Sequence, residues 1–133
     1  PIRTYTGNLT DDIVMIDKII GVGEVAIADH RCSHLSVHEL VRVASDARVG
    51  GILSGKAGVV SIHTGDDQTK LSLLKDAVAN SAIPASQFYP THINRNQALL
   101  DDGVVWAKMG GIIDMTTSTN ELFVEEGEVN LSC

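Results

Sequence analysis

The chain has 133 residues, of which 44% are hydrophobic and 4% are aromatic, and its formal net charge is −7. This is the size of one domain, and the acidic balance and scarce aromatic residues argue against a nucleic-acid partner. No apolar run reaches the roughly 20 residues of a membrane-spanning helix, so we expect no membrane partner. The two cysteines, Cys32 and Cys133, make neither a disulfide framework nor a paired metal motif, which predicts a reducing, cytoplasmic location.

The first part of the chain predicts a helix followed by a strand. Thr10 suits the N-cap position, two acidic residues follow it, and isoleucines then recur at helical spacing. The short apolar run 19–24 predicts a strand with Glu24 at its end. Residues 28–36 are polar and predict a loop.

A second helix and a second strand come next. Ser36 and Glu39 have the spacing of a capping box, which predicts a helix that the glycine pair 50–51 ends. Residues 58–63 are rich in β-branched side chains and predict a strand that ends at His63.

The following elements keep the same alternation. Leucines within residues 71–78 predict a third helix, and Pro84 would prevent its continuation. Residues 87–92 predict a short strand that ends at His92, although a proline inside it weakens this assignment. Residues 96–109 predict a fourth helix, which another glycine pair ends.

The end of the chain predicts one more strand, residues 111–117, and a strand that has barely begun at residues 128–131. Helices and strands that alternate with short connections are typical of a mainly parallel α/β sheet. Two architectures fit equally well, a small doubly wound domain and about half of a (β/α)8 barrel, which usually needs about 250 residues. We expect residues 1–133 to be a single segment that is cut at both ends.

Metal-binding side chains stand at the ends of three predicted strands. The functional site of a parallel α/β protein lies at the carboxyl ends of its strands, so Glu24, His63 and His92 are expected to meet there. Imidazole nitrogens and a carboxylate suit Zn2+ or a similar ion, which lowers the pKa of its bound water to near 7. A single histidine is more often a hydrogen-bonded surface residue, and it is the matching positions of these two that favour a metal site.

Four other residues are weaker candidates. His34 and His38 are four residues apart, but the glutamate of the zinc-peptidase motif is absent, so we expect both to be solvated. Arg31 and Arg95 each follow a predicted strand end. A guanidinium there could bind a substrate carboxylate or form only a structural ion pair.

Five stretches of the chain together resemble a known family. They are IIGVGEVAIADHR at residues 19–31, RVGGILSGKAGV at residues 48–59, HTGD at residues 63–66, PTHINRN at residues 90–96 and GGIID at residues 110–114. In order and spacing they resemble the isoaspartyl dipeptidases (β-aspartyl peptidases) of the amidohydrolase superfamily, which have a binuclear zinc site in a (β/α)8 barrel. The resemblance implies a partial barrel of the amidohydrolase type, roughly strands four to eight.

The resemblance also implies roles for five residues. His63 and His92 match two zinc-binding histidines, and Glu24 stands where many relatives have a carboxylated lysine that bridges two zinc ions. Arg31 and Arg95 match arginines that bind the carboxylates of the dipeptide. The implied reaction is hydrolysis of the isopeptide bond of a β-aspartyl dipeptide by a metal-activated hydroxide, with Zn2+ as cofactor and with a homo-oligomer as one arrangement of the enzyme.

Several parts of the family's site are expected outside this chain. A His-x-His motif and a tyrosine would lie upstream, and the aspartate that acts as general acid and base is expected just beyond Cys133. The isolated chain is therefore expected to be inactive. Two alternatives remain open: a catalytically inactive α/β fragment that associates through its open sheet edges, and another amidohydrolase that acts on a cyclic amide.

Overall fold

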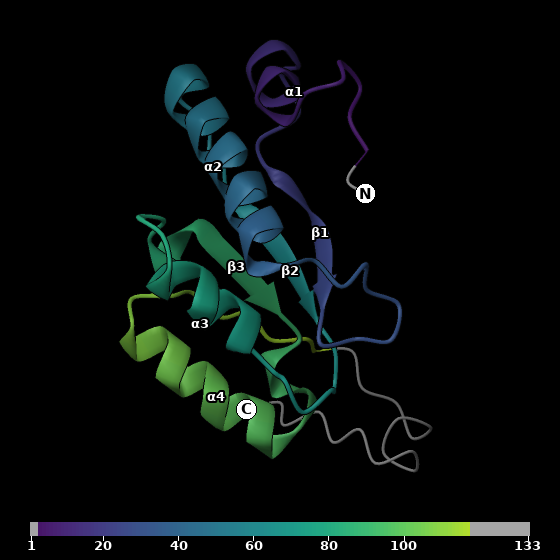
Figure 1. The fold of residues 1–133 in the computed structure, drawn as a ribbon, viewed down its shortest axis with the longest axis vertical. Helices are drawn as coiled ribbons and strands as arrows, with labels where there is room; N and C mark the ends of the chain where they lie inside the picture. The colour runs from purple at the N-terminus through teal and green to yellow at the C-terminus, as the bar shows by residue number, and fades with distance from the viewer. Residues whose placement is uncertain (1–2, 118–133) are drawn as a thin grey trace.

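The structure, a computed structural model, describes residues 3–117. Its centre is a sheet in the order β1-β2-β3, and both neighbouring pairs are parallel, so all three strands point to the same end of the sheet (Figure 1). The strands are β1 (Val22–Ile27), β2 (Val60–Thr64) and β3 (Phe88–Thr91). The helices are α1 (Leu9–Met15), α2 (Val37–Ser54), α3 (Ser72–Ala79) and α4 (Gln97–Lys108), with 3-10 turns η1 (Ala85–Gln87) and η2 (Ile93–Arg95). The predicted α/β alternation and the parallel sheet are confirmed.

One face of the sheet packs against the helices. On β2, Val60, Ile62 and Thr64 are fully buried, whereas Ser61 and His63 between them are only partly buried. Burial alternates because successive side chains of a strand point to opposite faces. The buried face of the sheet and the helices form one apolar cluster. The largest buried side chains in this cluster are Trp106, Phe88, Ile13, Leu40, Ile62, Leu71, Leu74, Ile93 and Leu99. Ser61 and His63 are left on the other face.

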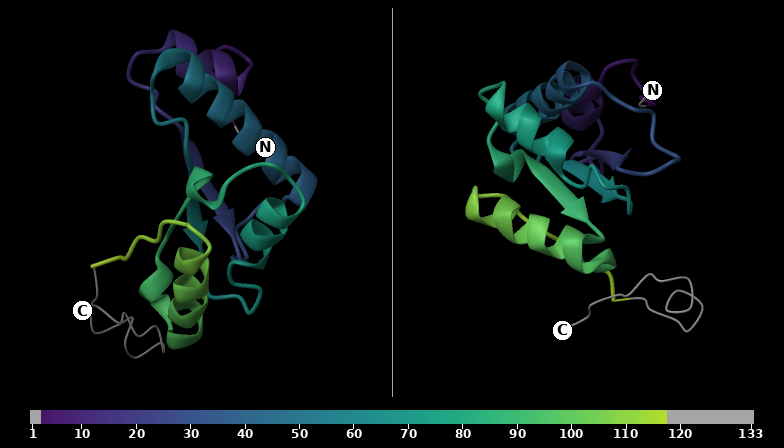
Figure 2. Two further views of the ribbon diagram at one scale, coloured as in Figure 1. Left: turned by 90° about the vertical axis from the view of Figure 1, so that its left-hand side faces the viewer. Right: turned by 60° about the horizontal axis from the view of Figure 1, so that its bottom comes forward.

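Helices α1 and α4 lie far apart, at different ends of the structure (Figure 2). Helix α1 packs against the C-terminal half of α2, far from the carboxyl ends of the strands. Lys56 stabilises this contact, because its Nζ donates hydrogen bonds to the carbonyls of Ile13 and Ile16 at 2.6 and 2.8 Å. Helix α4 packs beside β3, where the rings of Trp106 and Phe88 are 6.3 Å apart. None of the helices within residues 3–117 is long and apolar enough to cross a membrane.

Helix α2 begins as predicted but ends later. Ser36 Oγ accepts from the Glu39 N–H at 3.3 Å, and the Glu39 carboxylate accepts from the Ser36 N–H at 2.8 Å, so the capping box is confirmed. The predicted stop at the glycine pair is wrong. Gly51 lies inside the helix, and a glycine is needed there because another segment packs closely against it. A Cβ on Gly51 would lie only 2.7 Å from the Cα of Gly58. The helix ends at Ser54, and its C-cap is Gly55, whose φ is +70°.

The first helix and the first strand also differ from their predicted bounds. The N-cap of α1 is Asn8, whose side chain accepts from the Asp11 N–H at 3.1 Å, and not Thr10. Strand β1 continues to Ile27, so Glu24 lies within the strand and not at its end. The apolar pattern that was expected to stop at Glu24 resumes directly after it.

A β-bulge in β1 sets the direction of Glu24. The register against β2 shifts between Val22 and Val25, where three residue steps on β1 match two on β2. Inside the bulge, Gly23 has a φ of +146°, and a Cβ there would lie 2.6 Å from the Cβ of Ser61. Bulges redirect side chains, and this one leaves Glu24 beside the polar face of β2.

Residues 111–117 run beside β3 but do not form the predicted strand. Two backbone hydrogen bonds join the segments: Asp114 N–H donates to the Pro90 carbonyl at 2.9 Å, and Ile93 N–H donates to the Asp114 carbonyl at 3.2 Å. Bonds in a regular parallel ladder are evenly spaced, two residues apart on each strand. Here His92, with a φ of +65°, adds a residue between the two bonded positions and interrupts the ladder.

The remaining elements lie close to their predicted positions. Helix α4 has Asn96 as its N-cap, whose Oδ1 accepts from the Leu99 N–H at 2.9 Å, and α3 ends well before Pro84. The strand predicted at residues 128–131 and the position of Cys133 lie outside the described residues.

Candidate metal centre

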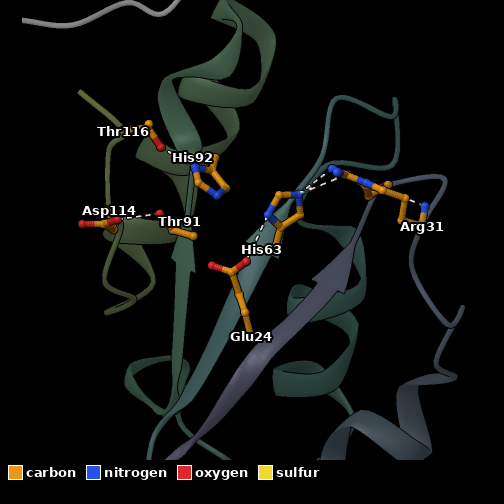
Figure 3. Close-up of polar contacts among 8 residues, drawn as sticks. Glu24, Arg31, His63, Thr91, His92, Asp114 and Thr116 are labelled. Carbon is orange, nitrogen blue, oxygen red and sulfur yellow. Dashed lines mark hydrogen bonds and ion pairs between the residues drawn. The ribbon is translucent and has the colours of Figure 1, made fainter. Parts of the chain in front are cut away.

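Three side chains predicted to bind metal lie together at one end of the sheet. Glu24 comes from β1, His63 from β2 and His92 from the residue after β3 (Figure 3). One ligand atom from each lies within 4.8 Å of the other two. For His63 and His92 the convergence follows from the topology, because neighbouring parallel strands end at the same edge of the sheet. Glu24 joins them from the bulge inside β1.

Glu24 and His63 form the closest pair of the three. Glu24 Oε2 lies 3.2 Å from His63 Nδ1. The glutamate side chain is 47% exposed and the histidine side chain 16% exposed, so the pair is open to solvent on the glutamate side. The carboxylate is therefore the more accessible member of this pair.

A buried carboxylate holds the other nitrogen of His63. Nε2 lies 3.1 Å from Oδ2 of Asp29, whose side chain is only 5% exposed. Hydrogen bonds from the Arg31 side chain are the largest cause that lowers the pKa of the Asp29 carboxyl, and the Arg31 backbone N–H and His63 add to this effect. The pKa is therefore far below its ordinary value, although burial raises it. Asp29 is therefore an ionised acceptor throughout the neutral range.

The ring of His92 is oriented from both sides. Its Nδ1 contacts the hydroxyl oxygen of Thr116, and its ring stands edge-on to that of His63, with centroids 4.7 Å apart at 70°. Burial is the largest cause that lowers the pKa of His92 below its ordinary value, and the neighbouring His63 and the charge of Arg95 act in the same direction. The neutral imidazole, which is the metal-binding form, is thus favoured.

The segment after α4 is fastened to the site by side chains. Thr91 Oγ1 donates to Asp114 Oδ2 at 2.5 Å. Asn94 and Thr116 exchange two bonds: Asn94 Nδ2 donates to the Thr116 carbonyl at 2.8 Å, and the Thr116 N–H donates to Asn94 Oδ1 at 2.9 Å. These bonds hold Thr116 against His92 although no regular ladder forms.

Both candidate arginines lie at the same end of the sheet. Arg31, in the loop after β1, has its Nη2 3.3 Å from His63 Nε2, and its side chain is 64% exposed. Arg95 belongs to η2, directly after His92, and its charge acts on that histidine. Their predicted role in binding substrate carboxylates stays a prediction.

The histidine pair His34 and His38 lies outside the cluster of three ligands that the described part of the chain contains. His34 Nδ1 instead lies 3.4 Å from Cys32 Sγ. Asp29 and Thr116, which support the two clustered histidines, had no predicted role. The spacing of Asp29 and Arg31 in the predicted loop is the one signal that could have indicated the former.

Comparison with known proteins adds to this geometry. No family model matches the chain. A solved β-aspartyl dipeptidase from the thermophilic keratin-degrading Fervidobacterium islandicum AW-1, in complex with a β-Asp-Leu dipeptide, is 44% identical over 90% of this chain, with a TM-score of 0.85. The chain resembles the β-aspartyl dipeptidases. A second structure of a β-aspartyl dipeptidase from that organism is 40% identical over 94% of this chain, with a TM-score of 0.81.

The resemblance to β-aspartyl dipeptidases is therefore confirmed in both sequence and structure. It concerns only part of those proteins, since the chain spans 32% and 37% of the two dipeptidase chains. A parallel α/β segment of that size is consistent with part of a barrel.

Proposed function

We propose that this chain is the metal-binding part of a hydrolase that cleaves β-aspartyl dipeptides. The observation that carries the proposal is the meeting of Glu24, His63 and His92 within 4.8 Å, in a chain 40% and 44% identical to β-aspartyl dipeptidases. The dipeptide seen in one of those dipeptidases supports the choice of substrate class.

The donor set fits a zinc ion. Zinc in proteins binds histidine nitrogen and carboxylate oxygen at about 2.0–2.2 Å in a tetrahedral shell, whose ligand atoms are then about 3.3 Å apart. Glu24 Oε2 and His63 Nδ1 are 3.2 Å apart, which matches one edge of such a shell. The other nitrogen of each histidine already has a polar neighbour, as is usual for metal-bound imidazole.

Glu24 is the proposed bridging ligand of a binuclear site. Its two carboxylate oxygens can serve two ions, as those of a carboxylated lysine do. Its exposed side chain leaves space on the solvent side for a second ion. A bound divalent ion would supply a more acidic water and would polarise the scissile carbonyl.

Arg31 and Arg95 are proposed to hold the substrate. A β-aspartyl dipeptide carries two free carboxylates, and a guanidinium binds a carboxylate through parallel hydrogen bonds. In hydrolysis, water adds to the amide carbon, the C–N bond breaks and the departing amine receives a proton. No described residue is given the role of moving that proton.

The test uses the complete polypeptide in which this chain occurs, because the chain spans about a third of the solved dipeptidases. We expect it to bind zinc and to hydrolyse β-Asp-Leu faster than the α-linked isomer. H63N and H92N should each lose zinc and activity, whereas H38N, a matched change of an exposed histidine on α2, should lose neither. If the protein binds no zinc when zinc is supplied, the inactive α/β fragment would be favoured. Opening of a cyclic amide with β-Asp-Leu left intact would favour another amidohydrolase.

A further inference from the structure

We propose that Asp29 is a positioning residue that holds the metal ligand His63 and the substrate-binding candidate Arg31 through one carboxylate, so that the two are fixed as a unit. The inference rests on the proposed function and deepens it, because it names the group that relates the metal to the substrate-binding loop.

Both oxygens of the Asp29 carboxylate are engaged. Oδ2 lies 2.7 Å from Arg31 Nη2 and 3.1 Å from His63 Nε2. Oδ1 accepts from Arg31 Nε at 2.8 Å and from the Arg31 backbone N–H at 2.8 Å. The side chain is 5% exposed, so these partners replace water around a charged group. A carboxylate held in this way has little freedom to turn.

This arrangement selects the tautomer of His63 that a metal requires. Two groups lie beside His63 Nε2: the Asp29 carboxylate, which only accepts hydrogen bonds, at 3.1 Å, and Arg31 Nη2, which only donates them, at 3.3 Å. The carboxylate is the closer of the two, so a neutral His63 beside Asp29 carries its proton on Nε2. The lone pair of Nδ1 then points to Glu24, 3.2 Å away, where the proposed ion would lie. Without Asp29, the proton could move to Nδ1 and block the ligand atom.

The same carboxylate fixes the plane of the Arg31 guanidinium. The Nε–Nη2 edge is bound to Asp29 in a bidentate manner, so a substrate carboxylate has to approach the guanidinium from another side. Moving Asp29 would therefore disturb the metal ligand and the arginine together.

A glycine makes room for this carboxylate at the end of β2. A Cβ on Gly65 would lie 2.7 Å from the Cβ of Asp29 and 2.1 Å from the carbonyl oxygen of Ala28. The Gly65 N–H donates to the carbonyl of Ile27 at 3.0 Å, which ties the start of the loop to the strand that carries His63. The position of Asp29 is thus set by the backbone of two strands.

The test is D29N in the complete polypeptide, with D67N as the matched control. Asp67 caps its own turn in the same manner, accepting from Thr69 N–H at 2.9 Å and from Thr69 Oγ1 at 2.6 Å, but it is not part of the cluster. We expect D29N to weaken zinc affinity about 10- to 100-fold and to raise KM for β-Asp-Leu, with D67N within about twofold of the unsubstituted protein.

The outcomes separate the two proposals. If the unsubstituted protein binds zinc and cleaves the dipeptide while D29N keeps its zinc affinity and KM, even with a lower melting temperature, Asp29 is only structural and the inference is wrong. If the unsubstituted protein binds no zinc, the proposed function fails and the inference fails with it.

A second measurement needs no variant, and it decides the matter if D29N does not fold. NMR of isotope-labelled histidine in the zinc-loaded protein should show the His63 proton on Nε2. A proton on Nδ1 would overturn the inference.

Discussion

Replacing Gly65 with alanine should displace the loop that carries Asp29. The added Cβ would lie 2.1 Å from the Ala28 carbonyl oxygen and 2.7 Å from the Asp29 Cβ. These neighbours are a backbone atom and the first side-chain atom, so no flexible end of a side chain can turn aside. The backbone itself has to move.

The size of the displacement follows from the first contact. Cβ atoms essentially never approach other heavy atoms closer than 3.0 Å, so the 2.1 Å separation has to grow by about 0.9 Å. A shift of this size exceeds the tolerance of a charged hydrogen bond between Asp29 and His63. We expect G65A to weaken zinc affinity about tenfold or more and to lower the free energy of unfolding by about 1–3 kcal/mol.

Competition with a chromogenic chelator measures the zinc affinity, and urea unfolding measures stability. The control is G50A, because Gly50 lies in α2 and the three atoms nearest to a Cβ there belong to the side chain of Ile13, at 3.0–3.3 Å. G50A should leave zinc affinity unchanged. A folded G65A protein that binds zinc within about twofold of the unsubstituted protein would refute the reasoning.

Three further predictions concern packing, ligand orientation and pH. G51A should be less stable than G50A by about 1–2 kcal/mol in urea unfolding. Both replacements gain the same helix propensity, but a Cβ on Gly51 would lie 2.7–2.9 Å from backbone atoms, whereas the atoms nearest to a Cβ on Gly50 belong to a side chain. Equal stabilities would contradict this reasoning. T116V removes the hydroxyl at His92 Nδ1 and should weaken zinc affinity about tenfold without a comparable loss in T69V, and an unchanged affinity would contradict the role of Thr116. The Asp29 carboxyl has a depressed pKa in the folded protein, so it stabilises the fold above the ordinary carboxyl range, and this contribution is lost as the pH falls below that range. D29N should therefore lose less stability than the unsubstituted protein between about pH 5 and pH 3. Parallel plots of unfolding free energy against pH would contradict this.

The parallel sheet and the meeting of the two histidines could be predicted because both depend on short-range patterns. Glu24 was expected at a strand end, and it meets the histidines from a bulge inside β1 that the sequence pattern did not predict. Blocks of helical and strand-like residues alternate, and side chains at the carboxyl ends of neighbouring strands must share one edge. His63 was therefore placed correctly within one residue of the end of β2. His92 was expected to close a strand and instead follows β3 in a left-handed conformation.

The features that were missed depend on contacts between distant segments. A glycine pair is typical of a helix end, but Gly51 lies inside α2, where the close packing of the Gly58 backbone leaves no space for a side chain. The segment 111–117 has the apolar pattern of a strand, and only the backbone of His92 prevents a regular ladder. The role of Asp29 depends on a partner 34 residues away, which no local pattern reveals.

The bulge in β1 separates the placement of Glu24 from the packing of its strand. Val22 and Val25 face the apolar interior, whereas both residues between them, Gly23 and Glu24, are exposed. Removing Gly23 would therefore restore an even pairing with β2 without turning Glu24 inward or the valines outward. The shortened strand would keep its apolar side chains in the core, and what changes is the backbone path that carries the carboxylate to His63.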